Sequence, residues 1–335
     1  MKISVAICAY NAERTLARTI ESVIKQTYTD YEVVIVNDGS TDQTLTIAKQ
    51  YQKENPSIIR IKSIPNGGLA NARNHAMNLC TGDLYINLDA DDYLERDTFE
   101  RAVSIFENDC NIDACFYGYK FFDENGKFFE SYLETMSYPQ SEISGLEAFQ
   151  LRSCRHIGIC QGNIIYRFSM IRENNITNFP GMDQGEDIYF IDRCLLASRK
   201  VGFFTADNFC CMVRNDSMNH SKFNSSFLQV LNIVDKLEEV VSQNYASKLD
   251  QILPYIQIER CFQALTVIKR MARYFDINNY CKEVKGSLGI LKTVDRKSIW
   301  KYLNLQKKIE FCLSRVSIRG YYYITRFYDH FLIRK

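Results

Sequence analysis

The chain has 335 residues, 46% of them hydrophobic and 24% charged, and a formal net charge of +1. This length suffices for one large domain or two ordinary ones, and the near-neutral charge gives the whole molecule no general attraction to nucleic acid. No stretch approaches the roughly 20 apolar residues that span a bilayer, and the opening residues MKISVAICAY are typical of a buried strand, not of a secretory signal.

The first hundred residues alternate between apolar runs and helical patterns. The runs are short, as expected for strands buried on both faces, and they lie at residues 3–8, 31–36, 58–64 and 83–88. After the first run, Leu16, Ile20 and Val23 repeat on one face of a helix. This alternation predicts a mostly parallel α/β sheet, in which ligands bind beyond the carboxyl ends of the strands.

The middle of the chain departs from this alternation. Asn125-Gly126 is a strong hairpin signal, so we expect a β-hairpin at about residues 113–132. Residues 158–174 predict a strand that leads into a helix, and residues 200–206 and 209–214 predict two short strands.

The C-terminal part has a helical pattern. From about residue 224 the apolar residues keep a 3.6-residue period, so we expect helices to the end of the chain. Residues 296–335 hold ten Lys or Arg against two acidic residues, with aromatic residues interleaved. Two interpretations of this tail stay open: it docks on an anionic membrane face, or it packs its aromatic side chains inside a helical bundle that forms a homodimer.

Twelve cysteines are spread along the chain, without a CxxC pair or the Cys/His spacing of a zinc site. Several of them stand inside apolar runs, which indicates buried free thiols in a reducing compartment. We therefore expect a cytoplasmic protein.

Three aspartates, Asp89, Asp91 and Asp92, follow the strand predicted at residues 83–88. Carboxylates this close repel one another and resist losing their water. One interpretation is a solvated acidic loop. The other is a site for Mg²⁺ or Mn²⁺, which takes one or two carboxylates together with the oxygens of a bound diphosphate.

Further acidic residues stand where they can complete such a site. Asp38 follows the second predicted strand, although an Asx turn is an alternative role for it. Glu186 and Asp187 begin a predicted helix, where the helix dipole alone also favours carboxylates. A positioned carboxylate is a group that can take the proton from an attacking hydroxyl.

Four stretches, in this order, resemble the family 2 glycosyltransferases of bacterial surface-polysaccharide synthesis: SVAICAYNAERT, VVIVNDGSTDQT, NGGLANARNHAMNLCTGDLYINLDADD and GEDIYF. The resemblance is close over residues 3–100 and looser over residues 155–220. It implies a GT-A fold, a Rossmann-like sheet flanked by helices. Residues 1–222 would form the nucleotide-sugar-binding and catalytic domain, and residues 223–335 a helical C-terminal domain.

The resemblance also implies roles for single residues. Tyr10 would stack on the nucleotide base, and Asp38 would accept a hydrogen bond from a uracil N–H or bond the ribose. Asp187 would be the catalytic base. Asp91 would hold Mn²⁺ or Mg²⁺, with His220 as a further metal ligand. Arg73 would face the diphosphate or pin the aspartates. The nucleotide-sugar-binding residues would be Ala9, Tyr10, Asn11, Asp38, Arg73, Asp89, Glu186 and Arg214.

These features together predict a metal-dependent inverting glycosyltransferase. We expect it to move one sugar from a UDP-sugar to a hydroxyl of a saccharide acceptor, such as a lipid-linked intermediate of a cell-surface glycan. We expect it in the cytoplasm or on the inner face of the cell membrane. One alternative is a nucleotidyltransferase, which would carry a glycine-rich and basic loop near the start of the chain. Another is a non-catalytic scaffold protein that binds nucleotide-sugars. A turnover assay would separate an enzyme from such a non-catalytic protein.

Overall fold

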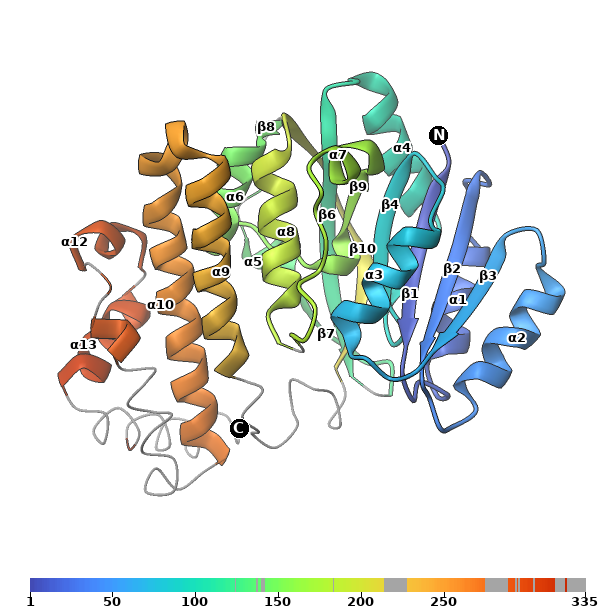
Figure 1. The fold of residues 1–335 in the computed structure, drawn as a ribbon, viewed down its shortest axis with the longest axis horizontal. Coiled ribbons are helices and arrows are strands. Elements are labelled where there is room, and N and C mark those ends of the chain that lie inside the picture. The colour runs from blue at the N-terminus through green and yellow to red at the C-terminus, as the bar shows by residue number, and fades with distance from the viewer. Residues whose placement is uncertain are drawn as a thin grey trace. The chain divides into compact units, whose positions relative to one another are not determined.

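The structure is a computed structural model, and it divides into two compact units, Met1–His220 and Ser221–Lys335 (Figure 1). The residues that it describes are 1–123, 125–136, 138–139, 142–182, 184–213, 228–274, 289–292, 294, 296–303, 305–316 and 323.

A mixed sheet of ten strands forms the centre of the described part of the first unit (Figure 1). Its main path runs in the order β3-β2-β1-β4-β9-β6-β10-β5, with β7 beside β6 and β8 beside β10. The strands are β1 (Ile3–Ala9), β2 (Tyr31–Asp38), β3 (Ile59–Ile64), β4 (Leu84–Asp89), β5 (Tyr93–Leu94), β6 (Ile112–Asp123), β7 (Phe128–Ser131), β8 (Ile143–Ser144), β9 (Ile164–Arg167) and β10 (Lys200–Val213).

The first four long strands are parallel, as their apolar runs and intervening helices predict. The α/β fold class with a mostly parallel sheet is therefore confirmed. The pairing register aligns Ala9 with Asn37 and Cys8 with Asp89. The carboxyl ends of β1, β2 and β4 consequently meet at one edge of the sheet, where residues 9–11, 38–40 and 89–92 follow one another across neighbouring strands.

Helices cover both faces of this sheet (Figure 1). On one face, α1 and α4 bury Leu16, Ile20 and Phe99 against Val5 and Ile86. On the other face, α3 and α8 lie in front of the sheet in Figure 1. The helices of the first unit are α1 (Leu16–Ile24), α2 (Thr44–Glu54), α3 (Leu69–Leu79), α4 (Thr98–Asn108), α5 (Tyr132–Thr135), α6 (Gly145–Ser153), α7 (Phe168–Glu173) and α8 (Glu186–Ala197).

One local prediction needs correction. The two short strands expected at residues 200–206 and 209–214 form one strand, β10, which pairs in parallel with β6 through register shifts between Phe204 and Phe209. The irregular stretch interrupts the apolar pattern without ending the pairing. The strand that leads into a helix, expected within residues 158–174, is confirmed as β9 followed by α7, and β9 runs antiparallel between β4 and β6.

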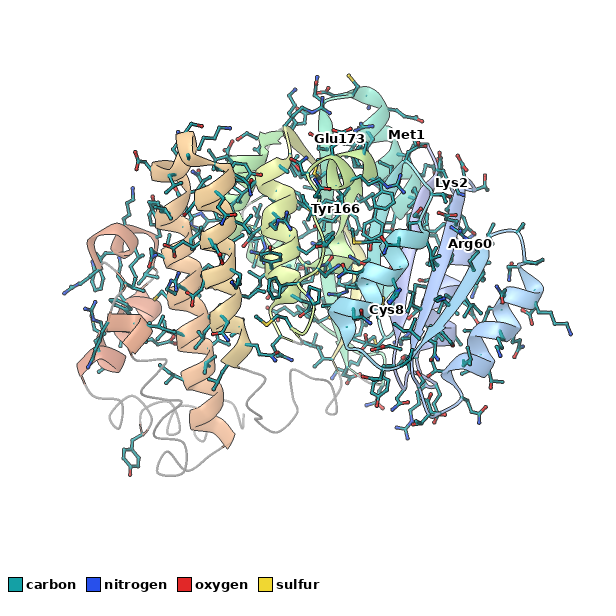
Figure 2. All side chains as sticks on the ribbon, in the orientation of Figure 1. Met1, Lys2, Cys8, Arg60, Tyr166 and Glu173 are labelled. Carbon is teal, nitrogen blue, oxygen red and sulfur yellow. The ribbon has the colours of Figure 1, made fainter. Side chains whose placement is uncertain are left out.

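A charged cluster lies at the amino ends of the strands, away from the edge where Asp38 and Asp89 stand. The Glu32 carboxylate, 6% exposed, accepts hydrogen bonds from Ser4 Oγ at 2.7 Å and Thr81 N at 2.6 Å. It also pairs with Lys2 Nζ at 2.9 Å and an Arg60 Nη at 2.8 Å. Figure 2 shows Lys2 and Arg60 toward one end of the sheet and Cys8 toward the other.

The described part of the second unit is helical, as predicted. Helix α9 (Gln229–Asn244) buries Leu231, Val234 and Leu237. The other elements are η3 (Ala246–Lys248), α10 (Leu249–Tyr274), α12 (Arg296–Ile299), η5 (Trp300–Tyr302) and α13 (Leu305–Val316). Of the basic tail, residues 304, 317–322 and 324–335 lie outside the described residues. Among the helices that the structure describes, none is both long enough and apolar enough to cross a membrane.

Candidate active site

Arg73 joins two parts of the chain at the candidate site. Its side chain is 3% exposed, and its guanidinium donates a hydrogen bond of 2.8 Å to Asp89 at the end of β4. A second bond of 2.8 Å goes to Glu186, the first residue of α8. The arginine therefore holds the start of α8 against the end of β4, and it brings Asp89, Glu186 and the adjacent Asp187 into one neighbourhood.

Glu186 and Asp187 occupy different environments although they are neighbours. The Glu186 side chain is 7% exposed and is paired with Arg73. Burial, together with the charge of Asp187, raises the pKa of Glu186 above its ordinary value, although Arg73 opposes this shift. Asp187 is only partly buried, and its carboxylate accepts a hydrogen bond from the N–H of Ile188 at 2.8 Å. Of the two acids, Asp187 is thus the one with a more accessible carboxylate.

Asp38 holds the loop that leads into α3. Its two carboxylate oxygens accept hydrogen bonds from the N–H groups of Gly67, at 2.8 Å, and Gly68, at 3.0 Å. Gly68 has a φ of 85°, in the region that favours glycine. Since each carboxylate has about four acceptor positions, Asp38 keeps the capacity to bind a ligand as well as this loop.

The residues after β1 present an exposed aromatic ring. Ala9 is buried at the end of the strand, whereas the Tyr10 side chain is 55% exposed. Asn11 has a φ of 48°. Its backbone N–H donates to Ser40 Oγ at 3.0 Å, and its Oδ1 accepts from the N–H of Thr41 at 2.9 Å. These bonds fix the loop that carries Tyr10 beside the loop that follows Asp38.

Residues 89–92, which we call the acidic turn, follow β4 and are held in place by hydrogen bonds from β10 and from α1. Asp92 is 6% exposed and accepts a hydrogen bond from the N–H of Met212 on β10 at 2.9 Å. Burial, and then the charges of Asp91 and Asp89, raise the pKa of Asp92 well above its ordinary value. From α1, Arg18 donates to the carbonyl oxygen of Asp91 at 3.1 Å, and Thr19 donates to that of Asp92 at 2.7 Å.

The donor set of this turn fits a hard divalent cation of the kind that also binds a diphosphate. The negative charges of Asp89, Asp91 and Asp92 oppose one another, and a cation among them would relieve that repulsion. Within the described ranges, no cluster of three or more His, Cys, Asp and Glu side chains is arranged to hold a metal ion. The arrangement suits Mg²⁺ or Mn²⁺, since these ions take one or two carboxylates and complete their coordination with water and phosphate oxygens.

Arg214 and His220 both lie in the segment 214–227, outside the described residues. Other contacts were missed from the sequence, notably those of Arg18 and Thr19 with the acidic turn. Each of them joins residues 73 positions apart through a backbone carbonyl, so no local pattern of residue types could have indicated them.

Comparisons with known proteins find similar sequences among glycosyltransferases. The family model described as "Glycosyl transferase family 2" matches residues 4–174. A chondroitin synthase of Pasteurella multocida (strain Pm70) is 43% identical over 115 residues, which are 34% of this chain and only 12% of that protein. The uncharacterized glycosyltransferase YibD of Escherichia coli (strain K12) is 27% identical over 82% of this chain and 81% of its own length.

A solved structure shares the fold. The crystal structure of S. aureus TarS 1-349 in complex with UDP-GlcNAc superposes with a TM-score of 0.73 at 18% sequence identity, over 98% of this chain and 92% of that one. At that identity the similarity concerns the fold alone, and it matches the GT-A architecture expected from the sequence.

Proposed function

This chain belongs to glycosyl transferase family 2, and from that premise we propose that it transfers one sugar from a UDP-sugar to a hydroxyl of a saccharide acceptor. UDP as the nucleotide is supported by the exposed ring of Tyr10 and the carboxylate of Asp38 at neighbouring strand ends. It is also supported by the fold shared with a structure that contains UDP-GlcNAc.

The observation that carries the proposal is the bridge made by Arg73 between Asp89 and Glu186. It supports a single site in which the acidic turn faces the donor diphosphate while the start of α8 faces the acceptor. In this arrangement Asp91 would hold Mn²⁺ or Mg²⁺, together with His220, and Asp89 would lie near the ribose of the donor. The cation would stabilise the charge that develops on the departing diphosphate.

The acceptor side needs a base, and we assign this role to Asp187. Its carboxylate takes the proton of the acceptor hydroxyl while the new bond from that oxygen to the anomeric carbon forms. The bond from the anomeric carbon to the diphosphate oxygen breaks, and UDP leaves with the electron pair. A single displacement inverts the anomeric configuration. In the same proposal, Ala9, Asn11, Arg73, Glu186 and Arg214 line or support the donor site.

We further assign the acceptor to cell-surface glycans, in line with the polysaccharide synthase among the relatives. The basic tail at residues 296–335 supports a place on the inner face of the cell membrane. Cosedimentation of the full chain with anionic and with neutral vesicles tests that place, and the oligomeric state in solution tests the homodimer alternative.

A thermal-shift series with UDP-, GDP-, CMP- and dTDP-sugars, with and without Mn²⁺, tests the donor. A ligand that binds only the native state raises its stability in proportion to the logarithm of its concentration. We expect the largest shift with a UDP-sugar and Mn²⁺, followed by release of UDP when a saccharide acceptor is added. Donor binding without any turnover would identify a non-catalytic binding protein instead.

A further inference from the structure

The hairpin of β6 and β7, with the first residue of α5, carries a row of aromatic rings, which we name the aromatic ladder: Tyr119, Tyr132, Phe121 and Phe129. Neighbouring ring centroids are 4.1 Å apart for Tyr119 and Tyr132, 5.3 Å for Tyr132 and Phe121, and 5.7 Å for Phe121 and Phe129. Exposure rises along the row, from 9% for Tyr119 to 50% for Phe129. The ladder therefore begins in the core and ends in solvent.

The inner part of the ladder lies beside the acidic turn of the candidate site. Phe121 and Cys211 are partners in the register of β6 and β10, so their side chains share one face of the sheet. Burial, and then the charge of Asp92, raise the pKa of the Cys211 thiol, and the next residue, Met212, donates its N–H to the carboxylate of Asp92 at 2.9 Å. In Figure 1, β7 and the start of α8 both lie toward the end of the sheet where β1 and β4 finish. The ladder is thus continuous with the site that contains Asp92.

Phe129 has the geometry of a stacking surface. Its ring is stacked on Phe121 at an interplanar angle of 21°, and half of its side chain is exposed. One ring face is consequently packed on Phe121, while about half of the residue is exposed to solvent. A flat aromatic face of this kind suits the apolar C–H face of a pyranose ring, and exposed aromatic groups beside a site mark binding surfaces.

The net charge of the hairpin indicates which class of ligand the aromatic ladder can bind. Residues 119–134 contain two lysines and four acidic residues, a net charge of −2. One of the lysines, Lys120, is paired with Glu95 at 2.7 Å. This balance disfavours an anionic lipid surface or a nucleic acid. It suits a neutral saccharide, whose hydroxyl groups donate hydrogen bonds to carboxylates.

We propose that the aromatic ladder binds the acceptor saccharide, with Phe129 stacking on a sugar ring one or more units away from the hydroxyl that reacts. The inference rests on the proposed function, since it names the acceptor surface of the same site. An acceptor held in this way is a chain of several sugars and not a monosaccharide, because the exposed end of the ladder is separated from Asp92 by the other rings.

The chain offers a matched pair of variants for the test. Phe128 and Phe129 are adjacent on β7 and are 48% and 50% exposed, but successive strand residues point to opposite faces. Phe128 packs edge-on against Phe122, outside the ladder. The probes are short oligosaccharides of glucose, galactose and N-acetylglucosamine, titrated by calorimetry into full-length protein saturated with UDP and Mg²⁺, and the UDP-sugar Kd is measured in parallel.

We expect Phe129→Ala to raise the Kd of the bound oligosaccharide about tenfold, the size of one lost aromatic contact. Phe128→Ala should leave that Kd unchanged, Phe129→Trp should restore it, and the Kd of the UDP-sugar should be the same in all three. Equal effects of the two alanine variants, or no oligosaccharide bound by a wild type that does bind UDP-sugar, overturn the acceptor surface while leaving the proposed function intact. A wild type that binds no UDP-sugar overturns both.

Discussion

Arg73 and Glu186 are 113 residues apart in the chain and form a buried ion pair of 2.8 Å. The same arginine holds Asp89 at the same distance. Two helices and the acidic turn are thus fixed around one guanidinium, and the stability of the protein and the geometry of the site depend on the same contact.

Replacing Arg73 by Met should destabilise the protein strongly, because two carboxylates lose the charge that compensates them. We expect the free energy of unfolding to fall by about 3–5 kcal/mol, as for other broken buried pairs. Urea unfolding measures the effect. Arg101→Met is the control: Arg101 pairs with Asp97 on the surface, where the side chains are 50% and 40% exposed, and its loss should cost under about 1 kcal/mol. Equal losses in both variants would contradict a role for Arg73 in holding the site together.

Asp187→Asn should remove sugar transfer and spare donor binding. An amide cannot take the proton of the acceptor hydroxyl, so we expect kcat to fall by about 10²–10⁴-fold, with the Kd of the UDP-sugar unchanged. Release of UDP in the presence of acceptor gives kcat, and calorimetry gives the Kd. Glu147→Gln, at an exposed carboxylate in the first turn of α6, is the control and should retain activity. Normal turnover by the Asp187 variant would rule out this base.

Asp91→Asn should weaken the binding of UDP and make it independent of Mn²⁺. The amide is a poorer ligand for a hard cation than the carboxylate, and the bound diphosphate loses the charge that balances it. Titrations of UDP with Mn²⁺ and with a chelator give the metal dependence in each protein. Asp123→Asn, on the β6–β7 hairpin, serves as the control. A variant whose UDP affinity still responds to Mn²⁺ as the wild type does would show that the cation is held elsewhere.

Protonation of Glu32 should make the free energy of unfolding depend on pH in the acid range. Burial alone would raise its pKa, but hydrogen bonds from Ser4, the Thr81 backbone and Lys2 outweigh burial and lower the pKa to about 2. The stabilisation is therefore complete above the ordinary glutamate pKa and is lost as pH falls from about 4.5 toward 2.

Glu32→Gln should reduce the free energy of unfolding at pH 7 by about 2 kcal/mol. This is less than the full pKa shift of Glu32 would give, because Lys2 and Arg60 are partly exposed and solvent weakens their interaction with the carboxylate. The difference from wild type should shrink at pH 3. Urea unfolding at the two pH values measures both quantities, with Asp30→Asn, at a side chain that is 60% exposed, as the control. A difference that grows at acid pH would contradict the sign of the shift.

Much of the sheet could be predicted because its signals are local. The strands β1, β2 and β4 are apolar runs that end on polar turns, and Asp38 and Asp89 stand at those ends in the printed sequence. The expected membership of family 2 and the GT-A fold are confirmed on the same stretches.

The remaining features depend on contacts between distant residues. Neither the antiparallel direction of β9 nor the continuity of β10 leaves a local pattern, because both are decided by neighbouring strands. The contact of Arg73 with Asp89 agrees with one of the two roles expected for this arginine. The pairing of Arg73 with Glu186, and the hydrogen bonds that Asp38 accepts from Gly67 and Gly68, leave no local pattern. The sequence indicates which residues carry charge at the strand ends, and the pairing of those charges emerges only from the folded chain.

The long separation between Arg73 and Glu186 also bears on how the protein acquires its activity during synthesis. A nascent chain whose β4 has just left the ribosome already contains the acidic turn. It does not yet contain α8, the helix that completes the site. Because contacts across such a long loop form slowly, we expect partly made chains to be unable to consume nucleotide-sugars until α8 has docked.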